Sequence, residues 1–338
     1  SAQIRTEAIV GLQFAARAVG DPRRHTETAD DDTTKQQRGP QTMRYAVAAC
    51  QTDFPCPAGR SEIASRVERM LAMIDGAVAG YRPFFPVRLV VFPEFAHAAP
   101  VYATVGELRD KLAVPVPNEH TDRYVAKARE HDIYIQTGTF IEADPRWPGV
   151  LFNTTCLIGP EGVLTKYRKV NPWIPWEVHA SPHDVPGYTD PLFPVARTPI
   201  GNLGCAICYD WLFPEATREL ALGGAEVLIR VSAYMDPWGA TLPMDWWTVV
   251  NRCRALENLA YVVAANQGAS LRHYKPFSWP GGSMVVDYDG RILAQAVFVP
   301  DGVEGQALGL FLQGQAGGVV AAALVVAQEV GRLQQGDE

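Results

Sequence analysis

Hydrophobic and polar positions alternate along most of the chain in blocks that predict short buried strands separated by amphipathic helices. The clearest helix covers residues 61–78, where apolar side chains recur at offsets of three and four. The predicted strands are short apolar runs, which suit a sheet that is covered on both faces. They lie at residues 44–50, 88–92, 133–141, 152–158, 162–168, 201–207, 225–231, 260–265, 283–288 and 291–297.

Further helices are predicted at residues 121–131, 213–222 and 243–256, between the strands. Strands that alternate with helices indicate a layered α/β protein. Asp289-Gly290 separates the last two strands and is a strong hairpin-turn pair. Because a hairpin pairs its strands in antiparallel fashion, we expect a mixed sheet. A loop rich in proline and tryptophan is predicted over residues 171–194.

The two ends of the chain depart from this pattern. Residues 1–42 are mostly polar, and only residues 4–19 have the spacing of a weak helix, so this segment is interpreted as a partly disordered extension. A single domain is then predicted over residues 43–300. Residues 301–338 are rich in Gly, Ala, Val and Gln and are interpreted as a divergent tail. Within it, residues 319–333 are interpreted as an apolar helix that docks on a neighbouring surface, and the tail is a candidate for an oligomer contact.

Composition narrows the classes of function. The 338 residues carry a net charge of −7 with no basic stripe, so we expect no nucleic-acid partner. No apolar run is long enough to span a bilayer, and residues 1–42 lack the features of a signal peptide, so we expect no membrane partner. Three of the six cysteines, at positions 50, 156 and 205, lie in apolar strands. Buried reduced thiols of this kind are typical of a cytoplasmic protein.

Cys208 is the first candidate for chemistry, because it stands where the apolar run 201–207 ends and just before a predicted helix. A strand-to-helix turn lifts a side chain out of the sheet and lets backbone N–H groups face a developing oxyanion. The N–H of Tyr209 is the natural donor. A lone cysteine is more often a buried structural thiol, so the assignment needs partners for Cys208.

Two complementary residues occupy equivalent positions at the ends of other strands. Glu94 follows the strand at 88–92, and Lys169 follows the strand at 162–168. Strand ends form the ligand crevice of open α/β folds, so the three side chains meet if their strands are neighbours that run the same way. A thiol needs a base to become a thiolate, and Glu94 would serve. Lys169 would stabilise the tetrahedral intermediate, although each residue alone is more often a solvated charge.

Cys205 and Cys208 form a C-x-x-C pair, which leaves a metal or dithiol function open. No second pair follows at zinc-site spacing, and positions three apart on a strand face opposite sides. Cys205 is therefore interpreted as a core residue. The chain also lacks glycine-rich phosphate loops and H-E-x-x-H, so we expect neither a metal nor a cofactor.

Three blocks together resemble the nitrilase superfamily of carbon–nitrogen hydrolases. They are Val91-Phe92-Pro93-Glu94-Phe95, Tyr167-Arg168-Lys169-Val170 and Cys208-Tyr209-Asp210, and the stretches 254–258 and 261–267 are also similar. The resemblance covers about residues 43–299. It implies an α/β fold of four layers, an αββα sandwich with two mixed β-sheets. It also implies a Glu94–Lys169–Cys208 triad, no cofactor and a homo-oligomer of two or more subunits.

The branch of the superfamily is indicated by finer features. Tyr209-Asp210 after the cysteine resembles amidases and carbamoylases, and residues 167–177 are similar to aliphatic amidases and formamidases. In that branch a second glutamate follows the lysine and helps to position substrate or water. Glu177 occupies the corresponding position in this sequence. The implied reaction converts a small amide into its acid and ammonia through a thioester on Cys208. N-carbamoyl hydrolysis, nitrile hydrolysis and a catalytically silent binding homologue remain alternatives.

The substrate pocket is less defined by the sequence. Trp173, Tyr234 and Trp238 are the candidates for its walls, although most tryptophans of a chain serve in core packing or subunit contacts. A carbamoyl amino acid would need a cation for its carboxylate. The candidates for that role are Arg230, Arg252, Arg254 and His179.

Overall fold

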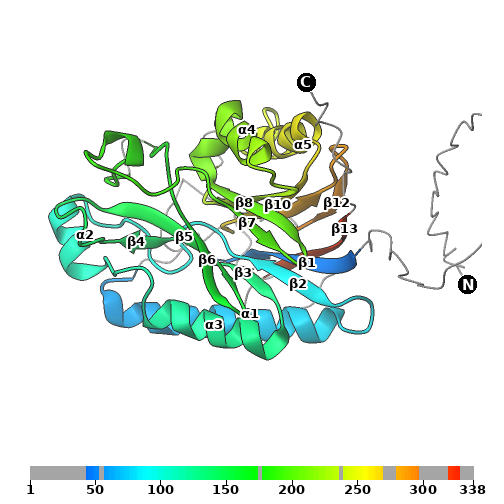
Figure 1. Cartoon of the computed structure of the whole chain (residues 1–338), viewed down its shortest axis with the longest axis horizontal. Coiled ribbons are helices and arrows are strands. Elements are labelled where there is room, and N and C mark those ends of the chain that lie inside the picture. The colour runs from blue at the N-terminus through cyan, green and yellow to red at the C-terminus, as the bar shows by residue number, and fades with distance from the viewer. Residues whose placement is uncertain are drawn as a thin grey trace, which may run out of the picture. The chain divides into compact units, whose positions relative to one another are not determined.

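The computed structural model describes residues 43–52, 57–173, 177–235, 239–268, 279–296 and 319–327, the last of these as backbone only. The described residues form two mixed β-sheets that pack face to face, with helices on both outer faces (Figure 1). This arrangement is the four-layer αββα sandwich that the sequence led us to expect. No described helix is both long enough and apolar enough to cross a membrane.

The first sheet contains the strand that precedes Glu94 and the strand that precedes Lys169. Its order is β13-β1-β2-β3-β5-β4, and β6 pairs with β5. The β1–β2 and β2–β3 pairs are parallel, whereas the other pairs are antiparallel. The bounds are β1 (Met43–Gln51), β2 (Val87–Val91), β3 (Tyr134–Gln136), β4 (Phe140–Glu142), β5 (Phe152–Gly159), β6 (Gly162–Arg168) and β13 (Val319–Ala327).

The second sheet contains the strand that leads to Cys208. Its order is β12-β11-β10-β9-β8-β7, with parallel pairing in the centre, between β8, β9 and β10, and antiparallel pairing on both sides. The bounds are β7 (Val195–Thr198), β8 (Gly201–Ile207), β9 (Val227–Ser232), β10 (Tyr261–Asn266), β11 (Met284–Val286) and β12 (Ile292–Gln295).

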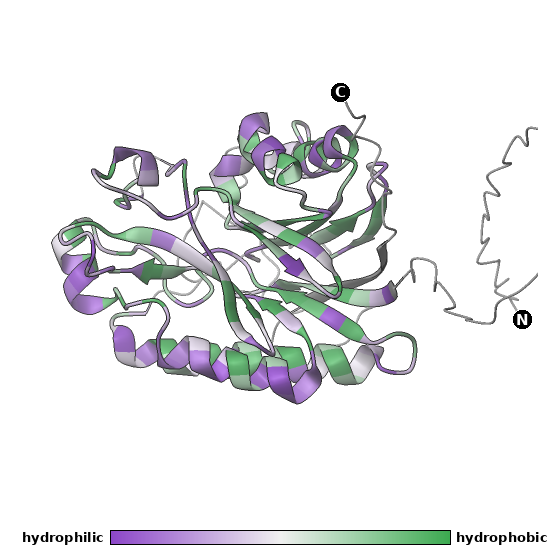
Figure 2. Cartoon of the chain, in the orientation of Figure 1, coloured by the Kyte–Doolittle hydropathy of each residue, from purple (hydrophilic) through white to green (hydrophobic). Residues whose placement is uncertain are grey.

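Helices complete the outer layers. α1 (Ile63–Tyr81) and α3 (Glu119–His131) cover the first sheet, and α4 (Pro214–Leu222) and α5 (Trp246–Asn258) cover the second (Figure 1). Short helices fill connections at α2 (Val105–Lys111), η1 (Arg60–Glu62), η2 (Pro182–Asp184) and η3 (Cys208–Leu212). The outward surfaces of α1 and α3 are polar while the strands are largely hydrophobic, as Figure 2 shows.

Strand β1 shows how one apolar run serves two cores. Tyr45, Val47 and Ala49 face the second sheet, where they share a cluster with residues such as Leu203. The alternate residues, Ala46, Ala48 and Cys50, pack with the buried side of α1. Since side chains alternate along a strand, a strand covered on both faces must be apolar throughout.

The predicted strand at 133–141 is two strands, β3 and β4, with a break at residues 137–139. The break is caused by the turn that carries Glu94. A Cβ on Gly138 would lie 2.5 Å from the Pro93 carbonyl oxygen, so the two segments touch. The Thr139 hydroxyl also accepts a hydrogen bond from the Phe95 N–H at 2.8 Å. The segment therefore leaves regular pairing to support the residues around Glu94.

The helix predicted at 319–333 is wrong for residues 319–327, which form β13 in antiparallel pairing with β1. Nine consecutive apolar residues have no polar face, which suits a strand in the interior of a sheet as well as a buried helix. Residues 328–333 and the weak helix at 4–19 lie outside the described part of the chain. The boundaries of the proposed domain and its extensions stay predictions.

Candidate active site

Glu94, Lys169 and Cys208 converge, but not along one edge of one sheet. β2 and β6 run in the same direction in the first sheet and are separated by β3 and β5, whereas β8 belongs to the second sheet. The three strands are therefore not neighbours, and the condition under which we expected their side chains to meet does not hold. The side chains meet because the two sheets are stacked, which brings the ends of their strands together.

The Glu94 carboxylate is completely buried and held on both oxygens. Its Oε1 accepts hydrogen bonds from Lys169 Nζ and Asn153 Nδ2, both at 2.8 Å. Its Oε2 accepts one from the Ala233 N–H at 3.0 Å, which links it to the end of β9. Gln267 Nε2 donates to the Glu94 carbonyl oxygen at 2.7 Å. The carboxylate is thus fixed by both sheets.

Lys169 lies between two carboxylates. Its ammonium group donates to Glu94 Oε1 at 2.8 Å and to Glu177 Oε1 at 2.5 Å, and its side chain is 1% exposed. The second oxygen of Glu177 accepts a hydrogen bond from the Trp173 N–H at 3.0 Å. Glu177 therefore fixes the loop that follows β6 as well as the lysine.

Cys208 occupies a sharp turn between β8 and α4. Its φ angle is +46°, in the left-handed region that residues other than glycine rarely adopt. The turn is held by Asp210, whose Oδ2 accepts hydrogen bonds from the Ile207 N–H at 3.0 Å and the Tyr167 hydroxyl at 2.7 Å. The turn therefore takes its shape partly from β6 in the other sheet.

Burial dominates the protonation of the site. It raises the pKa of the Cys208 thiol to about 12, and nearby Glu94 adds to the rise, while Lys169 opposes it. Burial also raises the pKa of Glu94 above its ordinary value, although the positive charge of Lys169 counteracts the effect. Burial alone would lower the pKa of Lys169, but Glu177 and Glu94 hold it well above its usual range. At neutral pH the Cys208 side chain is therefore a thiol rather than a thiolate.

A cavity of about 100 Å³ opens onto Cys208, Glu94 and Glu177. Nearly half of the residues that line it are aromatic, namely Phe95, Trp173, Tyr209, Tyr234, Trp246 and Trp279. Among the described lining residues, the only charged side chains are the two glutamates. The cavity therefore offers an apolar enclosure with a polar end at the thiol, as expected of a site for a small organic molecule.

Three of the four predicted pocket residues line this cavity, namely Trp173, Tyr209 and Tyr234. Trp238 lies outside the described residues. No contact tests the role of the Tyr209 N–H as an oxyanion donor, which stays a prediction.

None of the four predicted carboxylate anchors lines the cavity. Arg252 donates to the Gly290 carbonyl oxygen at 2.8 Å, and Arg254 donates to the Trp211 carbonyl oxygen at 3.1 Å. His179 is buried in a stack with Phe95, where burial lowers its pKa to about 3, so it is neutral. Arg230 lies beneath the Cys208 turn. The described wall therefore has no cation for a substrate carboxylate.

Several supporting residues were not singled out by the sequence. Asn153 donates to Glu94 through its side chain, and its carbonyl oxygen accepts from the Lys169 N–H at 2.9 Å. Asn266 accepts from the Tyr234 N–H at 2.7 Å and so fixes a wall of the cavity. Asn266 is a polar residue at the end of an apolar strand, which was an available signal, whereas Asn153 stands beside two threonines and does not stand out.

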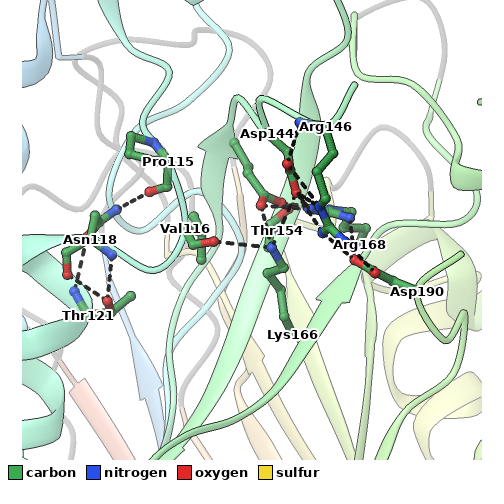
Figure 3. Close-up of polar contacts among 11 residues, drawn as sticks. Pro115, Val116, Asn118, Thr121, Asp144, Arg146, Thr154, Lys166, Arg168 and Asp190 are labelled. Carbon is green, nitrogen blue, oxygen red and sulfur yellow. Dashed lines mark hydrogen bonds and ion pairs between the residues drawn. The ribbon is translucent and has the colours of Figure 1, made fainter. Parts of the chain in front are cut away.

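Arg168, which directly precedes Lys169, anchors the end of β6 (Figure 3). Its guanidinium forms two 2.8 Å hydrogen bonds to Glu142 and further ones to Asp144 at 2.6 Å and Asp190 at 3.0 Å. The neighbouring Lys166 also binds Glu142, at 2.7 Å. Since Arg168 is 2% exposed, these bonds hold the strand from the side opposite Tyr167.

The structure describes Cys205 and Cys208 as free thiols, and Cys205 packs in the core between the sheets. One group of described residues has metal-ligand spacing, formed by Asp75, Glu130 and His131. These side chains lie on the surface and bind one another and Lys127, so they form an ordinary ion-pair cluster.

The chain is similar in sequence to known proteins. The sequence model of the family described as "Carbon-nitrogen hydrolase" matches residues 46–304. The chain is 32% identical over 256 residues to a protein named "Formamidase" from Bacillus thuringiensis, covering 74% of this chain and 70% of the relative.

Solved structures show the same fold. Nit3 of Saccharomyces cerevisiae, a member of branch 10 of the nitrilase superfamily, superposes with a TM-score of 0.63 at 23% identity, over 84% of this chain and 90% of that protein. An amidase from Nesterenkonia sp. gives a TM-score of 0.58 at 21% identity, over 83% and 90%.

Proposed function

The chain belongs to the carbon–nitrogen hydrolase family, and from that premise we propose that it is a cysteine amidase that converts a small uncharged amide into its acid and ammonia. One observation carries the proposal: Cys208, Glu94 and Glu177 face the same enclosed cavity, whose remaining described wall is apolar or aromatic. The formamidase relatives support a short acyl chain.

In the first half of the proposed reaction, Cys208 Sγ attacks the amide carbon. Glu94 takes the thiol proton and later gives it to the departing nitrogen, so that ammonia leaves and a thioester remains. A carboxyl group whose pKa is raised by burial is suited to both transfers. Lys169, which stays charged between its two carboxylates, stabilises the negative oxygen of the tetrahedral intermediate.

In the second half, water attacks the thioester carbon. Glu94 takes a proton from this water, and the proton returns to the sulfur when the acid leaves. Glu177 lines the cavity beside Lys169, so we assign it to the positioning of the lysine and of the attacking water. Splitting one difficult hydrolysis into two acyl transfers is the benefit of a covalent nucleophile.

The alternative functions differ in the residues that they require in the cavity wall. A carbamoyl amino acid carries a carboxylate, and a cavity whose described charges are both negative repels it. Nitrile hydrolysis uses the same nucleophile, and the sequence Tyr209-Asp210 after Cys208 favours amides. A silent binding protein would have no need of a thiol, a carboxyl group and an ammonium group gathered at one buried site.

The test is ammonia release from formamide, acetamide, propionamide, a simple nitrile and N-carbamoyl-β-alanine. We expect release from at least one short amide, loss of several orders of magnitude in Cys208→Ala, and no change in Cys253→Ala, whose thiol is exposed. Mass spectrometry of the quenched enzyme should find an acyl adduct on Cys208. Equal rates in wild type and Cys208→Ala would contradict the proposal.

A further inference from the structure

Arg230, on β9, is a buried cation that has no anionic partner among the residues the structure describes. Its side chain is fully inaccessible to solvent. Nη1 donates to Asn251 Oδ1 at 2.8 Å, and Nε and Nη2 have no hydrogen-bond partner. No carboxylate of the described residues lies within ion-pair distance of it. By contrast, Arg254 pairs with Glu257 at 2.9 Å, and Arg168 binds three carboxylates.

Aromatic rings surround the guanidinium instead. Its central carbon lies 4.4 Å from the ring centre of Trp247, 5.3 Å from that of Tyr234 and 5.4 Å from that of Trp211. Ring faces attract a cation without neutralising it. Burial lowers the pKa of Arg230 to about 10, so the group remains positively charged at neutral pH.

The strand register places this charge next to the end of the strand that leads to the nucleophile. Arg230 pairs with Ala206 across the parallel β8–β9 ladder, and Ile207 pairs with Val231. The ladder ends at this pair, and Cys208 follows Ile207 as the first residue of the turn. Arg230 is therefore paired two residues before Cys208, on the neighbouring strand. Arg230 also contacts Trp211, within the same turn as Cys208.

We propose that Arg230 is a positioning residue that stabilises the anionic sulfur of Cys208 with an uncompensated buried charge. The proposal deepens the proposed function and rests on it, because it concerns the nucleophile of that reaction. It assigns to Arg230 a role through Cys208, without contact to the substrate.

The charges around Cys208 explain why a second cation is needed. From the first sheet and its loops, Glu94 and Glu177 face the site, and Lys169 is bound to both. Asp210 adds a third buried carboxylate beneath the turn. A thiolate formed beside these groups gains little net attraction from Lys169 alone. Arg230, from the second sheet, supplies the positive charge that no carboxylate has taken.

The influences on the pKa of Cys208 agree with a stabilising role for Arg230. Burial raises it and Glu94 raises it further, while Lys169, Arg230 and the Ser232 hydroxyl act in the opposite direction. Arg230 could instead serve only as a spacer that holds Trp211 and Tyr234 apart. The two roles differ in their effect on the ionisation of the thiol.

The test follows alkylation of Cys208 by iodoacetamide in the full chain as a function of pH, with the modified peptide quantified by mass spectrometry. Arg230→Met keeps most of the volume and removes the charge. Asn251→Asp keeps Arg230 in place and sets a carboxylate against it. Asn258→Asp, on the same helix but bonded to the Arg254 carbonyl oxygen, is the matched control.

We expect Arg230→Met and Asn251→Asp to raise the pH midpoint of alkylation by about one unit or more, since one nearby charge shifts a pKa by that much. Asn258→Asp should match wild type. An unchanged midpoint in Asn251→Asp would overturn the proposal, even if Arg230→Met fails to fold. Because iodoacetamide is not a substrate, a missing amidase activity with an intact midpoint shift would contradict the proposed function and leave this inference standing.

Discussion

The Tyr167 hydroxyl donates a 2.7 Å hydrogen bond to the buried carboxylate of Asp210, and this bond joins the two sheets at the active site. Tyr167 stands two residues before Lys169, and Asp210 two residues after Cys208. Asp210 Oδ1 also accepts from the N–H and the side-chain amide of Asn171, at 2.7 Å and 3.0 Å. One carboxylate thus sets the position of the cation relative to the nucleophile.

Replacement of Asp210 by Asn should lower kcat more than it changes KM. An amide has one acceptor oxygen, so it cannot satisfy the four donors that converge on this carboxylate. A displacement near 1 Å of Cys208 relative to Lys169 lowers turnover on the order of 100-fold. Steady-state kinetics with the best amide of the panel checks this. A variant with normal kcat would show that the site keeps its geometry without the carboxylate.

The related variant Tyr167→Phe should destabilise the fold by about 1–3 kcal/mol, because it leaves a buried acceptor with one partner fewer. Urea unfolding measures the change. Tyr102→Phe removes a 2.7 Å hydrogen bond from an exposed hydroxyl to the Ala58 carbonyl oxygen and serves as control. Equal midpoints for the two variants would contradict the importance of the buried bond.

Glu177→Gln should reduce turnover on the order of 100-fold or more, comparable with the loss of an electrostatic catalytic contact. One carboxylate oxygen binds Lys169 and the other binds the Trp173 N–H, whereas a glutamine offers an acceptor to only one of these donors. The lysine would also lose half of its negative surroundings. Rates of acylation and deacylation, measured separately by single-turnover mass spectrometry, should both fall.

Glu219→Gln, on the surface of α4, provides a matched exchange far from the cavity. Its rates should equal those of wild type. Wild-type rates in Glu177→Gln would show that the second glutamate has no part in the reaction.

Acid should destabilise the fold through His97. This ring is fully buried, stacks on Phe140 at 3.8 Å and contacts the Tyr124 hydroxyl at 3.0 Å. Burial lowers the pKa of His97 from 6.5 to about 3. Between these values the unfolded chain binds a proton that the folded chain does not, so stability is lost as the pH falls from 6.5 towards 3.

The loss from His97 should amount to roughly 1 kcal/mol per pH unit within that window. Urea unfolding of wild type and His97→Gln between pH 7 and pH 4 measures this contribution of His97. The variant should lose less stability than wild type over this range. His183→Gln removes an exposed histidine and should keep the wild-type slope. Parallel curves for His97→Gln and wild type would refute the assignment.

We also propose that copies of the chain associate through the outer face of α5. Val249, Leu256 and Leu259, on or next to this helix, are each more than half exposed. An apolar patch of this kind is typical of a protein–protein interface. Sedimentation of wild type should show an oligomer, and Val249→Lys with Leu256→Lys should shift it towards monomer. A wild-type monomer at micromolar concentration would contradict the proposal, whereas Leu293→Lys, on β12, should have no effect.

The sequence predicted the regular elements well where their pattern was local. The apolar spacing of α1 and the apolar run of β8 each depend on neighbours within the element, so periodicity reveals them. The break between β3 and β4 was missed, because it depends on contact with residues around Glu94. The strand at residues 319–327 was predicted as a helix, because a uniformly apolar run does not distinguish a strand from a helix.

For the site, the sequence pointed to the three groups to which we assign the chemistry, but not to the residues that hold them in place. Glu94, Lys169 and Cys208 stand at strand ends, a position type that can be read from the chain. Asn153 acts through a partner far away in sequence, and Arg230 was considered only as a substrate anchor. Its distinguishing feature, burial without a carboxylate, exists only once the helix α5 has covered the sheet.

The pairing of β13 with β1 has a consequence for the order of assembly during translation. One neighbour of β1, the strand β2, is made soon after it, whereas the other is made only when residues 319–327 leave the ribosome. Until then, one side of β1 presents a row of free N–H and C=O groups, which is a template for pairing with other chains. Nascent chains of this protein therefore pass through a period in which one edge of β1 is open.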